Sequence, residues 1–141
     1  MPKHERSLET SAPPETIWRI WSDTATWPTW NPDIRAVSLD GPFASGTAGT
    51  MTTGAGTHRI RLDQVVSGRS FDLVTSPVPA TTFRFHCQVD PAPSGSRISQ
   101  GVSMSGILAP LFSLLMGNRI AESFRPILAG LAREAEKAAA R

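Results

Sequence analysis

Tyrosine is absent from the 141 residues of this protein, and cysteine occurs only once, at Cys87. A single cysteine excludes an intramolecular disulfide and a four-cysteine zinc site. Long hydrophobic runs are also missing. No stretch approaches the ~18 apolar residues of a membrane span, and the N-terminal segment lacks the apolar core of a secretion signal. We therefore expect a cytoplasmic protein without stable membrane insertion.

Charged residues are scarce as well, at 18% of the chain, and they nearly balance to a net charge of +2. So small an excess gives no case for nucleic-acid binding. The three histidines, His4, His58 and His86, lie on separate segments without the spacing of a metal site. Gly54-Ala55-Gly56 lacks the third glycine and the lysine of a phosphate loop. Neither a metal nor a cofactor is expected.

The hydrophobic fraction, 40%, is that of a globular chain, and the length suits one domain over residues 1–141. Clusters of glycine and proline divide the first two-thirds into short segments in which apolar and polar residues alternate. A period of two is typical of strands with one buried face. The expected strands are Glu5–Ser11, Ile34–Leu39, Thr47–Thr53, His58–Gln64, Arg69–Thr75, Thr81–Val89 and Arg97–Ser105. The alternation places Ile60, Phe71, Phe85, Ile98 and Met104 inward, and Arg61, Asp72, Arg84 and Ser103 outward.

Two regions have helical spacing instead. Prolines at a helix start, followed by Ile17, Trp18 and Trp21, predict a helix that ends near Asp23, and a short second turn carries Trp27. From about residue 110 to 139, apolar residues recur at three- and four-residue steps, which predicts one long amphipathic helix. Its expected buried residues are Phe112, Ile120, Phe124 and Leu131. The elements predict an α+β fold, in which a curved seven-stranded antiparallel sheet wraps around the C-terminal helix and leaves a space near its open end.

Several short motifs occur in this order of elements: Ala12–Trp18, Ser22-Asp23, Trp27–Pro32, Leu39–Phe43, Gly46, Gly95–Ile98 and Ser105-Gly106. In them the chain resembles the START-like superfamily, also called the polyketide cyclase/dehydrase and lipid-transport or SRPBCC superfamily. The resemblance implies the Bet v 1-like helix-grip fold, with two short helices after the first strand. Members bind lipids, polyketides or hormones, and only some catalyse a reaction, so the fold by itself does not supply the function.

The candidate site is an apolar cavity of roughly 300–1,000 Å³ between sheet and helix. Its expected lining is Trp30, His58, Phe71, Phe85, Gln100, Met104, Phe112, Met116 and Ile120. His58 and Gln100 are polar residues at inward positions. They predict either a hydrogen-bonding pair above the pocket or an exposed strand end for His58 and a bulge beside Gln100. Trp30 is either core or a ring at the mouth with an N–H for a ligand. His86, in the opposite register, is predicted to be solvated surface.

Three hypotheses of function follow. The first is a binding module that encloses a small hydrophobic ligand such as a lipid, an aromatic or a polyketide. The second is a polyketide cyclase, aromatase or dehydratase, for which His58 is the only good acid–base candidate. The third is a regulatory or interaction domain with a filled core. The expected partner is a small hydrophobic molecule, and a homodimer is left open.

Overall fold

Seven strands and three α-helices make up residues 4–140, the part of the chain that the computed structural model describes. In chain order they are β1 (His4–Thr10), α1 (Pro14–Ser22), the 3₁₀ turn η1 (Thr24–Thr26), α2 (Trp27–Trp30), β2 (Ile34–Leu39), β3 (Ala48–Thr53), β4 (Gly56–Val66), β5 (Ser70–Val78), β6 (Thr81–Ala92), β7 (Gly95–Ser105) and α3 (Ala109–Ala139). Each strand and both helical regions lie where the sequence predicts them, with ends shifted by a few residues.

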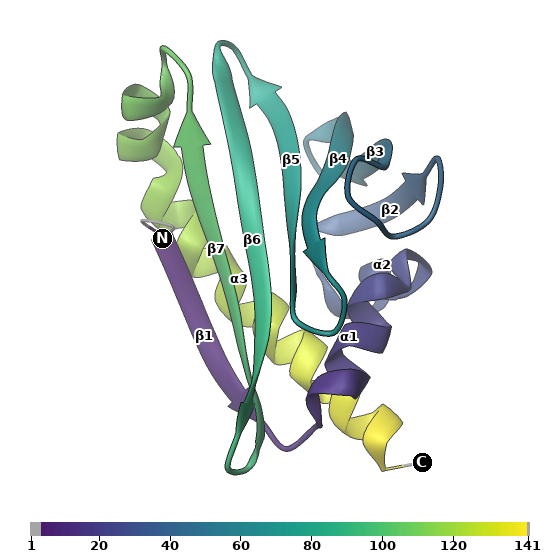
Figure 1. Ribbon diagram of the computed structural model, residues 1–141. Coiled ribbons are helices and arrows are strands. Elements are labelled where there is room, and N and C mark those ends of the chain that lie inside the picture. The colour runs from purple at the N-terminus through teal and green to yellow at the C-terminus, as the bar shows by residue number, and fades with distance from the viewer. Residues whose placement is uncertain (1–3, 141) are drawn as a thin grey trace.

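The strands form one antiparallel sheet in the order β1-β7-β6-β5-β4-β3-β2. The meander from β2 to β7 is therefore extended at its far edge by β1, and α1 and α2 connect the two edge strands. Figure 1 shows α3 running diagonally behind the sheet, from the end of β7 to the neighbourhood of α1. This arrangement confirms the predicted α+β helix-grip fold.

The hydrophobic core lies between the inner face of the sheet and the second half of α3. Ile60, Phe71 and Ile98 point into it and are at most 3% exposed, as the strand alternation predicts. Phe85 and Met104 also pack against the core but are only partly buried. Each of these two borders an open space, because Phe85 lines a cavity and Met104 lines a groove at the other end of the helix.

The first half of α3 is less covered than the sequence predicts. Phe124 and Leu131 are fully buried, but Phe112 and Ile120 are only half-buried, so the expectation of four buried residues is wrong for these two. At Gly117 the helix packs directly against the ring of His4, near the start of β1. The turns before Gly117 therefore run past the end of this strand and have less protein to pack against.

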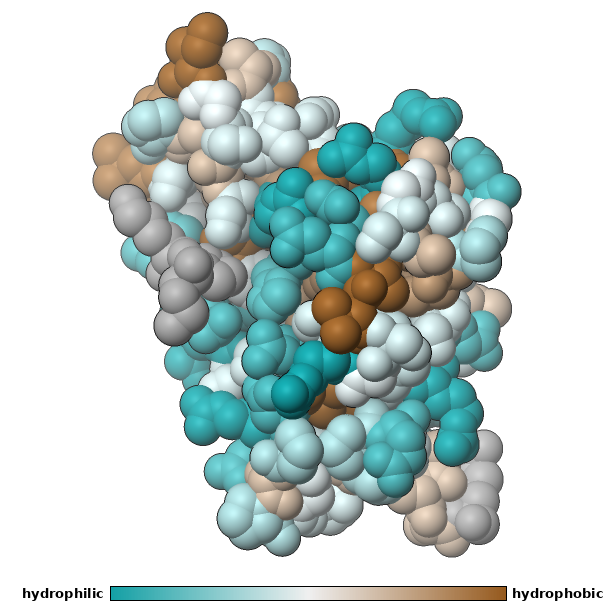
Figure 2. Space-filling view, in the orientation of Figure 1, coloured by the Kyte–Doolittle hydropathy of each residue, from teal (hydrophilic) through white to brown (hydrophobic). Residues whose placement is uncertain are grey.

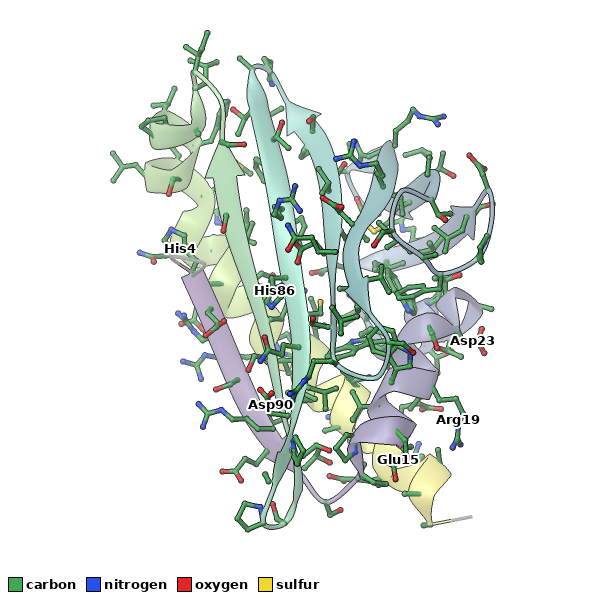
Figure 3. All side chains as sticks on the ribbon, in the orientation of Figure 1. His4, Glu15, Arg19, Asp23, His86 and Asp90 are labelled. Carbon is green, nitrogen blue, oxygen red and sulfur yellow. The ribbon has the colours of Figure 1, made fainter. Side chains whose placement is uncertain are left out.

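A row of hydrogen-bonded polar side chains crosses the outer face of the sheet, and Figure 3 shows two of its members, His86 and Asp90, on β6. We call this row the outer ladder; it comprises Asp63, Arg69, Asp72, Arg84, His86, Gln88 and Asp90. Asp72 points outward as predicted, yet it is only 4% exposed. Arg84 Nη1 donates to Asp72 Oδ2 at 2.8 Å, and His86 Nδ1 lies 2.6 Å from Asp72 Oδ1. These two side chains cover the carboxylate, so His86 is half-buried rather than solvated surface.

Hydrogen-bond acceptors flank both ring nitrogens of His86. Gln88 Nε2 donates to the carboxylate of Asp90 at 2.9 Å, which turns Gln88 Oε1 toward His86 Nε2, at 3.0 Å. Two acceptors suit an imidazolium, because a neutral ring has only one N–H to donate. Burial alone would lower the pKa of His86, but the hydrogen bonds to Asp72 and Gln88 and the nearby charges of Asp72 and Glu5 outweigh it and raise the pKa.

We expect the outer ladder to make the stability of the protein depend on pH. Because the folded-state pKa of His86 is raised, its contribution is fully present below the unfolded-state pKa, near 6.5, and is lost as the pH rises through the folded-state pKa. In urea unfolding from about pH 5 to about pH 9, the wild-type advantage over His86→Gln should therefore shrink as the pH rises.

The variant Asp72→Asn provides the control, since it removes the carboxylate that His86 faces. In that background the effect of His86→Gln should vary much less with pH. A wild-type advantage that is constant or that grows with pH would contradict this account of His86.

Candidate ligand-binding cavity

An aromatic cluster lies where α1 and α2 meet the sheet. Its members are Trp18, Trp21, Trp27, Trp30, Phe43 and Phe71. Phe71 of β5 is the central ring, with centroid distances of 5.5 Å to Trp21 and 6.1 Å to Trp27. Pro14 and Pro28 lie in the first turns of α1 and α2, where proline is compatible with a helix. The two short helices that begin there carry the four tryptophans.

The indole N–H groups of α2 are bound within the protein. Trp27 Nε1 donates to the Trp21 carbonyl at 2.9 Å, and Trp30 Nε1 donates to Thr26 Oγ1 at 3.2 Å. Thr26 Oγ1 in turn donates to the Asp23 carbonyl at 2.8 Å. The expectation that Trp30 offers its N–H to a ligand is therefore wrong. These bonds fix the rings, whose carbon surfaces border the adjoining space.

A half-open cavity of about 270 Å³ lies between this cluster, the inner face of the sheet and α3. It is slightly smaller than the sequence-based expectation. Its aromatic lining is Trp21, Trp27, Trp30, Phe71, Phe85 and Phe124. The other apolar residues of the wall are Ile34, Met51, Leu73, Cys87, Ile120 and Ile127. The cavity is thus an apolar, largely aromatic space, which is typical of sites for small organic ligands.

Five polar residues, Asn31, Asp33, Thr53, Gln100 and Ser123, complete the lining. Three of them already have local hydrogen bonds: Asn31 Oδ1 accepts from the Asp33 N–H at 3.0 Å, Thr53 Oγ1 accepts from the Ala55 N–H at 3.1 Å, and the Ser123 hydroxyl donates to the Ile120 carbonyl. Asp33 is exposed at the mouth. Within residues 4–140, the amide of Gln100 makes no side-chain hydrogen bond, so it can donate to or accept from a bound molecule.

Five of the nine residues expected to line the cavity do so: Trp30, Phe71, Phe85, Gln100 and Ile120. The other four, His58, Met104, Phe112 and Met116, do not. His58 lies opposite Met51 in the pairing of β3 with β4, and the longer, flexible Met51 side chain reaches the cavity instead. Met104 lines an open groove of about 700 Å³ between the end of β7 and the start of α3. Phe112 and Met116 lie on the less covered turns of α3.

Sequence reasoning missed several lining residues, chiefly Trp21, Trp27 and Phe124. The spacing of Trp27 and Trp30 in the Trp-Pro-x-Trp motif was a usable signal, since three-residue steps place both rings on one side of a helical turn. Phe124 was expected in the core, and it serves both core and cavity.

No histidine lines the cavity, although all three lie within the described residues. The cyclase hypothesis relied on His58 as its acid–base group, and the structure leaves that group outside. Cys87 does line the cavity, but burial raises the pKa of its thiol, so it stays protonated. The remaining acidic or basic residue in the cavity lining is Asp33, which lies exposed at the mouth. The arrangement offers contacts for binding and an amide for orientation.

The curved sheet, the long C-terminal helix and the half-open apolar space between them define a helix-grip domain of the Bet v 1-like class. The chain belongs to the polyketide cyclase / dehydrase and lipid transport family, whose model matches residues 1–136. Family and fold together support a ligand-binding domain. No curated protein matches the sequence.

Solved structures agree in fold at low sequence identity. The crystal structure of Ara h 8.0201 has a TM-score of 0.71 at 15% identity, covering 94% of this chain and 96% of that one. Hypothetical protein jhp0584 from Helicobacter pylori has a TM-score of 0.75 at 12% identity, covering 93% and 86%. TTHA0849 from Thermus thermophilus has a TM-score of 0.73 at 14% identity, covering 95% and 97%. Among residues 4–140, no helix is both long and apolar enough to cross a membrane.

Proposed function

We propose that the protein binds a small, mainly apolar molecule in the cavity beneath α3, with Gln100 orienting a polar substituent of that molecule. The observation that carries this proposal is the aromatic lining: six rings border one space, and the side chain of Gln100 lines it without a hydrogen-bond partner among residues 4–140. Burial of apolar ligand surface against these rings supplies the affinity. A hydrogen bond to the amide adds selectivity.

The size of the space favours a compact ligand. A dry engineered cavity of about 150 Å³ holds one benzene ring. A cavity of about 270 Å³ therefore suits a molecule of roughly two fused rings, or a short branched chain. An open space of this kind supports the binding hypothesis over the filled-core domain.

Because the chain contains no tyrosine, ligand binding can be measured by tryptophan fluorescence. All intrinsic fluorescence excited in the aromatic band comes from tryptophan and phenylalanine, and three of the four tryptophans line the cavity. Titration with azulene, an uncharged hydrocarbon of two fused rings that absorbs in the range of tryptophan emission, should quench that emission saturably.

Ser123→Trp, which fills the cavity from α3, should weaken probe binding at least about tenfold by removing the space for it. Ser113→Trp is the matched control, because this serine lies on the same helix but lines the separate groove at its other end. Gln100→Leu should leave probe affinity nearly unchanged and weaken a hydrogen-bonding ligand by about two- to tenfold. Equal probe binding by wild type and Ser123→Trp, with circular dichroism unchanged, would refute the cavity as the site.

A further inference from the structure

The end of the molecule where β7 turns into α3 exposes several aliphatic side chains. Ile107 is 88% exposed, Leu114 84%, Leu115 64% and Leu111 49%. Figure 2 shows the resulting hydrophobic surface at the upper left of the molecule, over the β7–α3 loop and the first turns of the helix. Contiguous apolar surface of this kind marks an interaction site.

Two segments that are distant in sequence build this end. Gly106, with a φ of +110°, turns the chain closely against the carbonyl of Ala80, and the Leu108 N–H donates to that same carbonyl at 3.3 Å. The β5–β6 hairpin tip therefore lies beside the loop that leads into α3. Together residues 77–80 and 107–115 form a projecting tip, which we call the apolar tip.

The charge around the apolar tip is one-sided. Neither of its two segments contains a charged residue, and no aspartate or glutamate occurs between Asp90 and Glu122. The nearest cation along α3 is Arg119, one turn beyond Leu115, and Arg59 lies on β4 next to the strand that leads to the hairpin tip. An uncharged projection flanked by Arg59 and Arg119 complements an anionic lipid surface.

The exposed area is too small for a stable dimer. A fully buried aliphatic side chain removes at most about 120 Å² of apolar surface, so the four side chains supply at most about 480 Å². An obligate homodimer interface buries at least about 1,000 Å² on each partner, of which about 65%, or roughly 650 Å², is apolar. Insertion of a few side chains among lipid headgroups needs neither this area nor a complementary shape.

We propose that the apolar tip docks the protein on the surface of a lipid bilayer, with Ile107, Leu114 and Leu115 inserted at the level of the headgroups. Docking of this type is peripheral and requires no membrane-spanning helix. Arg119 then lies near the headgroups and adds a preference for anionic lipid. The proposal concerns a surface at the N-terminal end of α3, whereas the cavity is lined by the middle of that helix, so it holds or fails independently of what the cavity binds.

Co-sedimentation with lipid vesicles tests it, using phosphatidylcholine with and without phosphatidylglycerol. The wild type should bind vesicles, and the double variant Leu114→Gln/Leu115→Gln should partition at least about tenfold less, because both inserted side chains are lost. Glutamine keeps the helix propensity of leucine nearly intact, so the fold should not change. Arg119→Gln should weaken binding about fivefold to vesicles with phosphatidylglycerol and leave binding to phosphatidylcholine alone unchanged.

Val66→Gln is the matched control. Val66 is an aliphatic residue that is 54% exposed, and it ends β4 at a distance from the apolar tip. It should bind vesicles like the wild type. Absence of wild-type binding to either vesicle would overturn the proposal, as would equal binding by the double variant. A dimer in light scattering that the double variant dissociates would show that a second copy covers the tip, and would also overturn it.

Discussion

Replacing Phe124 with alanine should lower the free energy of unfolding by about 3–5 kcal/mol, the range for buried aromatic residues. Phe124 is 1% exposed, and its ring meets Phe85 edge-on at a centroid distance of 6.2 Å. The truncation removes the main contact between the middle of α3 and β6, and it leaves a void that the surrounding side chains cannot fill. Urea unfolding followed by circular dichroism measures the loss.

Phe112→Ala is the control for this prediction. Phe112 lies on the same helix but is only half-buried, so its truncation should cost clearly less than that of Phe124. Because Phe124 also lines the cavity, Phe124→Ala should enlarge the space and allow a bulkier probe to bind. If the two variants lost the same free energy of unfolding, the contact of α3 with the sheet would not depend mainly on Phe124.

Gly130→Ala should lower the free energy of unfolding by about 1–3 kcal/mol, the usual cost of overpacking. Helix propensity alone would favour alanine over glycine by about 1 kcal/mol. The structure reverses that preference, because a Cβ at Gly130 would overlap the carbonyl oxygen of Trp30 in α2. A backbone atom cannot swing aside, so α2 must move away from α3.

Gly117→Ala is the matched control, since Gly117 is a second glycine of α3. A Cβ there would meet the ring of His4, a side chain that can rotate away at the start of β1. This variant should therefore be nearly neutral or slightly stabilising. Gly130→Ala should also weaken probe binding, because Trp27 and Trp30 move with α2. A Gly130→Ala protein as stable as Gly117→Ala would refute the close approach of α2 and α3.

The strands and their inward faces could be predicted from the sequence because the side-chain period of a strand is two. Once Phe71 and Ile60 are assigned to the core, every second residue on the same strand must follow, since a slip of one residue would expose them all. The structure keeps that register on β4, β5, β6 and β7. The long helix could likewise be found from its apolar spacing.

The candidate site was predicted only in part, and the errors have a common cause. Alternation places His58 inward and periodicity places Phe112 on the apolar face of α3, but neither tells how far along its element a residue is covered. The coverage of Phe112 depends on where β1 begins beneath α3. The position of His58 relative to the cavity depends on its neighbour Met51, whose side chain lines the cavity instead. The burial of Asp72 was missed for a similar reason, since Arg84 and His86 cover it from a neighbouring strand.

The local patterns of the sequence thus determined the elements, their order, the faces they bury and, through the resemblance, the helix-grip architecture. Periods of two and of three to four residues are properties of a single segment, and they need no knowledge of its neighbours. Only the tertiary structure decided that α2 rests on Gly130, that the cavity lies against the middle of α3, and that the N-terminal end of α3 exposes Leu114 and Leu115. These features arise where elements distant in the chain meet. The contacts there depend on the lengths of the strands and on where α3 crosses the sheet, and the periodicity of a single segment contains no information about either.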